Sequence, residues 1–279
     1  SENNNFDKHF KESVEDHIEE YMNDANLYMD DLLGNPFSAE EIEKVIRSLK
    51  LHKAPGWDNI TAEHVKYGGK VLWSCLTKIY KVLMTIEHIP MHFKIGVVVP
   101  IPKGDKNKLY QDNHRGLTLI TIFAKIFEKC FYIRFSKWCN DNKSLSDMQG
   151  AGKEHCSSMH SAWLVKEAIS SCLESGKNVY VGLLDTKKAF DTVWQDGLFY
   201  KMYQCGIHGK AWRMFVKLYR GFLCTVKIGG KLSEVFDTTQ GIHQGAPLSM
   251  DAYCINNNDM INELSDAITC LKIADLKIS

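Results

Sequence analysis

The residues with the clearest chemical potential are aspartates that follow apolar runs. Asp185 ends the run Val181-Gly-Leu-Leu184, and Asp275 ends a second run near the C-terminus. A buried carboxylate is unfavourable unless something cationic accompanies it, and a bound metal ion removes that penalty. For Asp185 taken alone, an aspartate that caps the turn after its strand is the more common arrangement.

The surroundings of Asp185 favour a metal-dependent site. Lys103 and Arg115 flank an earlier polar loop, and Phe190 follows Asp185 by five residues. Two carboxylates at neighbouring strand ends, with a basic loop nearby, suit two Mg²⁺ ions and a triphosphate. Such a site positions a hydroxyl group and neutralises the transferring phosphate, which is most of what phosphoryl transfer requires.

A sheet and supporting helices must position these residues. A Ser38-Ala-Glu-Glu41 capping box, stapled by Phe37 and Ile42, predicts the start of one helix. Apolar periodicity and β-branched runs predict the other elements. We expect helices over 6–33, 70–86, 121–138, 159–173, 198–203, 211–219 and 248–264, strands over 96–102, 178–184 and 269–273, and a hairpin over 225–236 turning at Gly229-Gly230. The strand 178–184 is expected to be central and buried.

The composition is that of a soluble globular protein, with 44% hydrophobic and 24% charged residues among 279. The net charge is zero, but acids concentrate in residues 1–45, so the remainder is basic enough to bind a polyanion. Nine unpatterned cysteines predict reduced thiols, and no apolar run reaches membrane-spanning length. We therefore expect an intracellular protein, nuclear or cytoplasmic, that does not contact a membrane.

Five blocks in order resemble the reverse transcriptase domain of non-LTR (LINE-type) retrotransposons. The fourth block closely follows the family pattern L-D-x-x-K-A-F-D-x-V, and the fifth resembles G-V-x-Q-G-x-x-L-S. The blocks are Lys53-Ala-Pro-Gly-Trp-Asp-Asn-Ile60, Pro100-Ile-Pro-Lys103, Asn113-His-Arg115-Gly-Leu-Thr-Leu119 with Lys125-Ile-Phe-Glu128, Leu184-Asp185-Thr-Lys-Lys-Ala-Phe-Asp191-Thr-Val193, and Gly241-Ile-His-Gln244-Gly245-Ala-Pro-Leu-Ser249. The resemblance covers residues 37–279.

The resemblance implies an α+β fold: the fingers and palm of a right-hand polymerase, with a small palm sheet backed by helices and no thumb. It divides the chain into an acidic N-terminal helical segment (1–36), fingers and upper palm (37–177), and a palm truncated at its second catalytic block (178–279). The implied activity is RNA-directed DNA synthesis with Mg²⁺, or with Mn²⁺ in its place. The implied partners are an RNA template, a DNA primer and deoxynucleoside triphosphates.

The resemblance also implies a role for each matching residue. Asp185 and Asp275 would be the catalytic, metal-binding carboxylates. Phe190 would pack under the incoming sugar and exclude a 2′-hydroxyl group, although a plain core aromatic is the simpler interpretation. Lys103 and Arg115 would hold the triphosphate, although without the family a solvated basic loop is the better interpretation. The remaining implied residues, which would line the nucleotide pocket and template, are Gln244 and Gly245.

The second catalytic block departs from the family pattern of an aromatic residue followed by Ala-Asp-Asp. Here the chain has Ile273-Ala-Asp275-Leu276, so either Leu276 replaces the second aspartate or one aspartate is deleted. Leucine offers no oxygen ligand to a metal ion. Two hypotheses therefore stay open: an RNA-directed DNA polymerase that uses two Mg²⁺ ions, and a catalytically inactive remnant or co-opted nucleic-acid-binding module. The altered block and the missing thumb favour loss of processive polymerisation. A third hypothesis, a structural protein that uses helix 6–33 for contacts, has no specific support.

Overall fold

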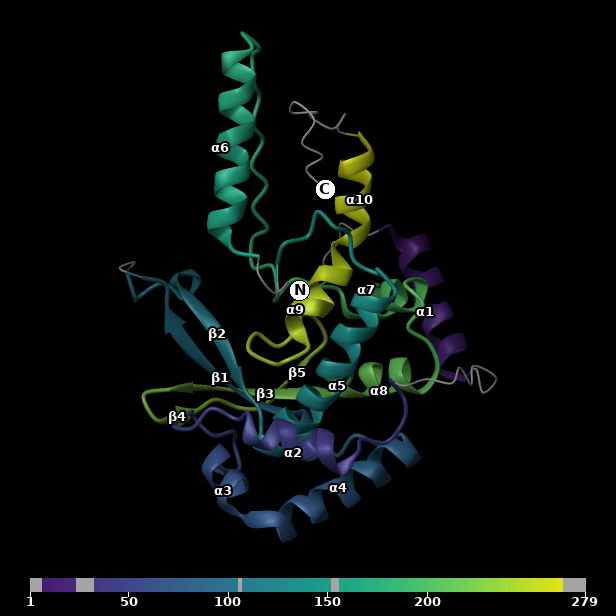
Figure 1. Ribbon diagram of the computed structural model, residues 1–279. Coiled ribbons are helices and arrows are strands. Elements are labelled where there is room, and N and C mark those ends of the chain that lie inside the picture. The colour runs from purple at the N-terminus through teal and green to yellow at the C-terminus, as the bar shows by residue number, and fades with distance from the viewer. Residues whose placement is uncertain (1–6, 24–32, 105–106, 152–155, 268–279) are drawn as a thin grey trace.

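A computed structural model describes residues 7–23, 33–104, 107–151 and 156–267. The chain forms a mixed α/β fold in which helices pack around one small sheet (Figure 1). The helices are α1 (Lys8–Asn23), α2 (Ala39–Arg47), α3 (Ala62–Tyr67), α4 (Gly69–Ile86), α5 (Ile122–Asp141), α6 (Ser158–Glu174), α7 (Gln195–Gln204), α8 (Gly209–Tyr219), α9 (Ser249–Asn256) and α10 (Asn258–Ala267). Among the helices that the structure describes, none combines the length and apolar character needed to cross a lipid bilayer.

The sheet is built around two parallel strands that are far apart in the sequence. Strand β1 (Ile95–Pro102) pairs antiparallel with β2 (His114–Leu119) and parallel with β3 (Phe222–Ile228). Strands β4 (Lys231–Leu232) and β5 (Phe236–Thr238) both pair antiparallel with β3. The predicted strand over 96–102 is thus confirmed, and so is the hairpin turn at Gly229-Gly230, where both glycines have positive φ.

Helix α5 runs through the core and joins the N-terminal helices to the rest of the molecule. Its Phe127 and Phe135 are fully buried, and Phe135 packs near Phe215 of α8. Arg134 of α5 donates to both carboxylate oxygens of Glu41 at 2.6 Å, which attaches α2 to α5. The predicted capping box at Ser38 and Glu41 is present and starts α2. Helices α2, α3 and α4 therefore form one end of the molecule (Figure 1).

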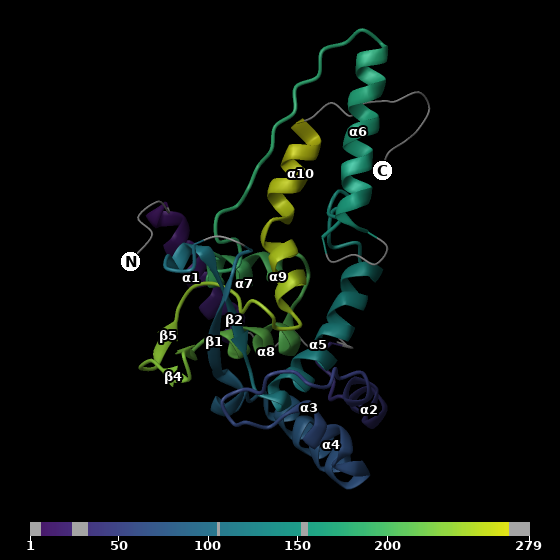
Figure 2. The ribbon, with the colours of Figure 1, turned by 90° about the vertical axis from the view of Figure 1, so that its left-hand side faces the viewer.

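The predicted central strand over 178–184 is wrong. This segment belongs to no strand, and Tyr180 and Leu183 are each 93% exposed. An extended run becomes a strand only when a neighbouring strand accepts its backbone hydrogen bonds, and no described strand lies beside it. Its predicted neighbour over 269–273, together with Asp275, lies outside the described residues. With α6, the segment projects away from the sheet in both views (Figures 1 and 2), and no described residue of α6 is buried.

Two other helix predictions differ from the structure. The helix expected over 248–264 is divided at Asn257 into α9 and α10. At this point the Asn256 carbonyl accepts a hydrogen bond from Lys201 Nζ at 2.6 Å, and the Asn258 side chain bonds the backbone of Ser144 and Ser146. Of the helix expected over 6–33, the structure shows α1 over Lys8–Asn23. Residues 6 and 24–32 of that range lie outside the described residues. Neither α3 nor β2 is indicated by the sequence patterns.

Candidate functional site

A cleft of about 830 Å³ lies where β1 and β2 face the segment 185–191, and we call it the strand cleft. It brings together five of the residues that the sequence singled out, from four separate parts of the chain. These are Lys103, Arg115, Asp185, Phe190 and Gln244. Of the two others, Gly245 lies in a neighbouring cleft and Asp275 lies outside the described residues.

The β1–β2 connection positions the two predicted phosphate-binding residues. The backbone amide of Lys103 donates to Asn113 O at 2.8 Å, and its Nζ donates to Asp112 O at 2.9 Å. Arg115 stands opposite Ile101 in the strand pair. Its guanidinium is exposed and has no partner among the described residues. Lys103 therefore braces the loop, and Arg115 is available to a ligand.

The turn after Asp185 is fixed to the β1–β2 connection by an ion pair. Lys188 adopts a positive φ of 54°, and its Nζ lies 3.0 Å from Asp112 Oδ1. The hydrogen bond and positive charge of Lys188 lower the pKa of Asp112. The Lys188 carbonyl also accepts the amide of Asp191 at 2.8 Å. The turn is thus held on both sides, although Asp185 itself is exposed and the burial argument made from the sequence does not apply to it.

The loop that carries Gln244 is attached to the same turn through backbone hydrogen bonds. Gly241 N donates to Val193 O at 2.8 Å, and Ile242 N donates to Phe190 O at 2.9 Å. Gln195 Nε2 donates to Gly241 O at 2.9 Å, and Thr118 N donates to Gln244 O at 3.1 Å. These bonds join the two sequence blocks to β2, so the side chains of Phe190 and Gln244 enter the cleft together.

Phe190 is half-buried and its ring stacks on Tyr253 of α9, with centroids 5.1 Å apart and 28° between the planes. The contact with the core fits the simpler interpretation of a packing aromatic. Because Phe190 also lines the strand cleft, the same ring is available to a ligand. Tyr253 was missed by the sequence analysis, since a tyrosine within a helical run carries no signal of its partner.

Two of the carboxylates that line the strand cleft, Asp112 and Asp185, differ in whether they are paired. Asp185 has no hydrogen-bond or ion-pair partner among the described residues, so its oxygen atoms are chemically suited to a hard cation. Asp112, by contrast, is paired with Lys188. In the part of the chain that the structure describes, no three acidic, histidine or cysteine side chains gather as metal ligands.

A second cleft, of about 490 Å³, adjoins the strand cleft at Gly245, and we call it the lysine cleft. Four lysines line it together with Ser48, Thr61 and Tyr132, and none of its described lining residues is acidic. The lysines are Lys50, Lys53, Lys125 and Lys129. Gly245 has a φ of 103°, and a Cβ there would come within 2.7 Å of the Leu117 side chain, which explains the glycine between the two clefts.

Comparison with known sequences decides the family. The family described as reverse transcriptase (RNA-dependent DNA polymerase) matches residues 101–276, which is more than half of the chain and includes every residue of the strand cleft except Pro100. The chain belongs to the reverse transcriptase family. The resemblance found in the sequence motifs is therefore confirmed.

Relatives of this reverse transcriptase domain come from mobile elements. A probable RNA-directed DNA polymerase from the transposon X-element of Drosophila melanogaster is 24% identical over 259 residues, covering 90% of this chain and 28% of the relative. The RNA-directed DNA polymerase of the mobile element jockey of Drosophila funebris is 25% identical, covering 89% of this chain and 27% of the relative. An uncharacterized 149 kDa protein of transposon TX1 from Xenopus laevis is 22% identical, covering 88% and 19%. The chain thus spans 19–28% of the length of these three relatives.

Proposed function

We propose that this reverse transcriptase domain takes part in RNA-directed DNA synthesis, with the incoming deoxynucleotide in the strand cleft. The observation that carries the proposal is the convergence of Asp185, Arg115, Phe190 and Gln244 on one cleft from distant parts of the chain. Relatives described as RNA-directed DNA polymerases support it. In this arrangement, residues 37–177 correspond to fingers and upper palm, residues 178–279 to palm, and residues 1–36 to a separate helical segment.

Each residue of the strand cleft has a proposed part in binding the nucleotide. Arg115 binds the triphosphate, since a guanidinium can donate two parallel hydrogen bonds to a phosphate group. Lys103, which lines the same cleft, adds a second positive charge for the triphosphate. Phe190 packs under the sugar and excludes a 2′-hydroxyl group, held in place by Tyr253 and by its carbonyl bond to Ile242. Gln244 lines the base or sugar side of the cleft.

Asp185 and Asp275 are the proposed ligands of a divalent ion, Mg²⁺ or Mn²⁺. When bound, such an ion neutralises charge that develops on the transferring phosphate. The free carboxylate of Asp185 at the edge of a basic cleft supports this assignment. In this proposal the chain binds the triphosphate through Arg115, and it supplies the carboxylates of Asp185 and Asp275 for the ion.

The lysine cleft is the proposed site of the template strand. Four lysines without an acidic neighbour in the cleft lining attract a phosphodiester backbone. Burial lowers the pKa of Lys125, which is half-buried beside Glu128. A phosphate bound there would offset the repulsion between the lysines. Because Gly245 separates this cleft from the strand cleft, a template seated in it would lie next to the nucleotide.

A second candidate function is nucleic-acid binding without catalysis. The observation that favours it is Leu276, which stands where the family has a second aspartate. A site with one fewer carboxylate binds divalent ions more weakly. The domain would then retain the lysine cleft and the fold but not processive polymerisation.

Primer extension separates the two candidates. The chain is given a primed RNA template, labelled deoxynucleotides and either Mg²⁺ or Mn²⁺, and single-nucleotide addition is measured alongside full-length extension. We expect no processive extension, single addition that Asp185→Ala abolishes, and an increase with Leu276→Asp. Template binding with no addition by any variant would favour the second candidate. Addition that survives Asp185→Ala would contradict the proposed site.

A further inference from the structure

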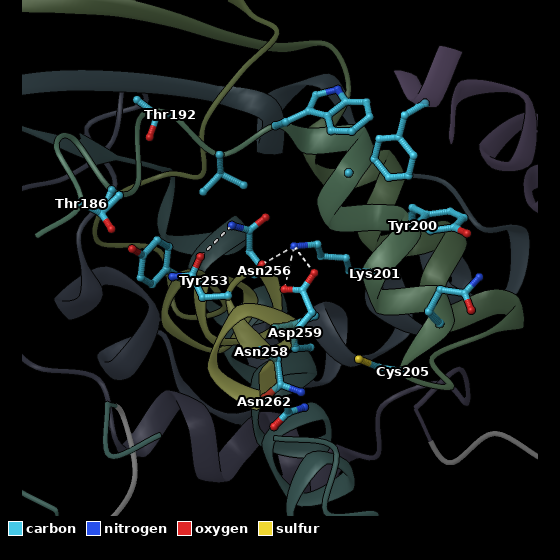
Figure 3. A pocket seen from close by; sticks show the side chains of 18 residues that line it. Thr186, Thr192, Tyr200, Lys201, Cys205, Tyr253, Asn256, Asn258, Asp259 and Asn262 are labelled. Carbon is cyan, nitrogen blue, oxygen red and sulfur yellow. Dashed lines mark hydrogen bonds and ion pairs between the residues drawn. The ribbon is translucent and has the colours of Figure 1, made fainter. Parts of the chain in front are cut away.

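A third cavity, of about 570 Å³, lies on the other side of the 186–194 segment from β1 and β2, and we call it the helix pocket. Its walls come from α7, from the junction of α9 and α10, and from Phe10 of α1 (Figure 3). The volume falls within the range of small-molecule sites in proteins. Nothing in the proposed synthesis of DNA uses this cavity.

Aromatic rings form one wall of the helix pocket. Trp194 and Tyr200 line it from the α7 side, whereas Tyr253 lines it from α9 (Figure 3). Phe10 meets Trp194 edge to face with centroids 6.2 Å apart. The Trp194 ring lies directly over Gly197, where a Cβ would come within 2.4 Å of its Cε3 atom. The glycine therefore allows the indole to lie against α7. Flat, supported rings of this kind offer a stacking surface to a planar ligand.

The charged side chains that line the helix pocket are paired with each other, whereas the lysine cleft has four lysines and no acidic residue in its described lining. Its only cation and only anion among the described lining residues are Lys201 and Asp259, whose Nζ and Oδ atoms are 2.9 Å apart. The same Nζ donates to Asn256 O at 2.6 Å (Figure 3). Since this lysine is already occupied on two sides, the pocket does not favour a phosphate. Its ligand should be neutral.

Carboxamides supply polar groups on the side of the pocket formed by α9 and α10. Asn256 Nδ2 donates to Asn257 Oδ1 at 3.1 Å, which leaves the oxygen atom of one amide and the nitrogen atom of the other available. Asn262 of α10 also lines the pocket, and its side chain has no partner among the described residues. Carboxamides match the paired donors and acceptors on the edge of a nucleobase, and aromatic rings stack on its faces.

We propose that the helix pocket binds one unpaired nucleobase of a nucleic-acid strand. The base stacks on the aromatic wall and its edge bonds the asparagine amides, while its phosphates remain outside the neutral cavity. Thr186 and Ala189 line both this pocket and the strand cleft, and Tyr253 links the two through its stacking on Phe190. A strand whose base enters the pocket therefore passes close to the site proposed for the nucleotide.

Binding of neutral nucleosides tests the proposal independently of polymerase activity. Adenosine and uridine are added to the full chain, and their affinities are measured by ligand-observed NMR, with benzyl alcohol as an aromatic probe that has no base edge. We expect Trp194→Leu to weaken nucleoside binding at least about fivefold, the range found when a stacking aromatic is removed. Trp163→Leu, which changes an exposed tryptophan of the distant α6, should leave the affinity unchanged.

Asn262→Leu provides a second variant whose fold is not at risk, because Asn262 is exposed on α10. It should weaken nucleoside binding at least about twofold, the smallest effect expected when one hydrogen bond is lost. Asn140→Leu on the exposed face of α5 should not weaken it. The proposal is overturned if nucleosides do not bind the wild-type chain at millimolar concentration, or if both pocket variants bind them normally. It is equally overturned if benzyl alcohol competes as well as a nucleoside, or if Arg115→Ala in the strand cleft abolishes the binding.

Discussion

Gly241 shows how a single backbone position holds the candidate site together. Its φ is 87°, and a Cβ there would come within 2.9 Å of Asp191 O and 3.1 Å of Phe190 O. A side chain would thus push apart the two loops whose hydrogen bonds place Phe190 and Gln244 in the strand cleft. Gly230 in the β3–β4 turn has a similar φ of 81° but nothing within 4 Å of a Cβ.

This difference predicts unequal effects of two alanine substitutions. Gly230→Ala should reduce the free energy of unfolding by about 1–2 kcal/mol, the usual penalty of a left-handed conformation. Gly241→Ala should reduce it further, because steric contact with a backbone adds to the same penalty. Urea denaturation followed by circular dichroism measures both. Equal losses would show that the loops move apart without resistance.

Glu128 is a buried acid whose titration should affect stability. Burial raises its pKa to about 8, and the nearby charge of Lys125 opposes this effect only in part. In the folded state the carboxyl therefore keeps its proton at neutral pH, whereas in the unfolded state it loses the proton above about pH 4.5. The folded state binds more protons in this interval, so stability falls as pH rises through it.

Glu128→Gln removes this dependence while keeping the shape of the side chain. Its free energy of unfolding, relative to the wild type, should increase by about 1.4 kcal/mol for each pH unit between about pH 5.5 and pH 7.5. Urea denaturation at the two pH values gives the comparison. If the two proteins differed in free energy of unfolding by the same amount at both pH values, Glu128 would ionise normally in the folded protein.

At the scale of elements, one buried asparagine holds the start of α10 next to its division from α9. Asn258 is buried, and its Oδ1 accepts from Ser146 N at 2.8 Å and from Gln149 Nε2 at 2.9 Å. Its Nδ2 donates to Ser144 O at 3.1 Å. The side chain thus ties the start of α10 to the connection that follows α5.

Asn258→Ala should reduce the free energy of unfolding by about 2–3 kcal/mol, because it removes three hydrogen bonds and leaves buried polar groups unpaired. Asn262→Ala, one turn further along the same helix and exposed, should change it by less than about 0.5 kcal/mol. Thermal unfolding of the two variants measures the difference. A small effect of Asn258→Ala would indicate that water replaces its hydrogen bonds without penalty.

The same elements show what the sequence could predict. Helices with a clear apolar stripe or a local cap, such as α2 with Ser38 and Glu41, follow from neighbouring residues alone. The strand predicted over 178–184 failed because a strand depends on a partner that is distant in the sequence. Strand β2 was missed for the same reason, since its polar residues pair with β1 across a loop.

The candidate site divides in a similar way. Lys103, Arg115, Asp185, Phe190 and Gln244 could be named from their motifs, and they do line one cleft. The residues that hold these side chains and their turn in place could not be predicted from the sequence. Tyr253 beneath Phe190 and Asp112 beside Lys188 lie in segments without a motif, and only the folded chain brings them into contact.

For the whole molecule, a net charge of zero conceals an uneven distribution of charge. Acidic residues concentrate in residues 1–45, whereas the lysine cleft has four lysines and no acidic residue in its described lining. Binding to a nucleic acid should therefore depend on this local surface and not on the overall charge. Each lysine that neutralises a phosphate releases a counterion, so the affinity falls as salt increases.

Replacing lysines of the cleft should change that salt dependence. In the triple variant Lys50→Gln, Lys53→Gln and Lys129→Gln, the slope of log affinity against log salt for single-stranded RNA should become shallower by up to about 2, or roughly 0.7 for each phosphate that is no longer neutralised. A control with the same change in charge replaces three exposed lysines of α4, Lys70, Lys78 and Lys81. Gel-shift titrations between about 50 and 200 mM salt measure both slopes. If the two triple variants weaken binding equally, the chain attracts RNA through its general surface, and the lysine cleft is not the template site.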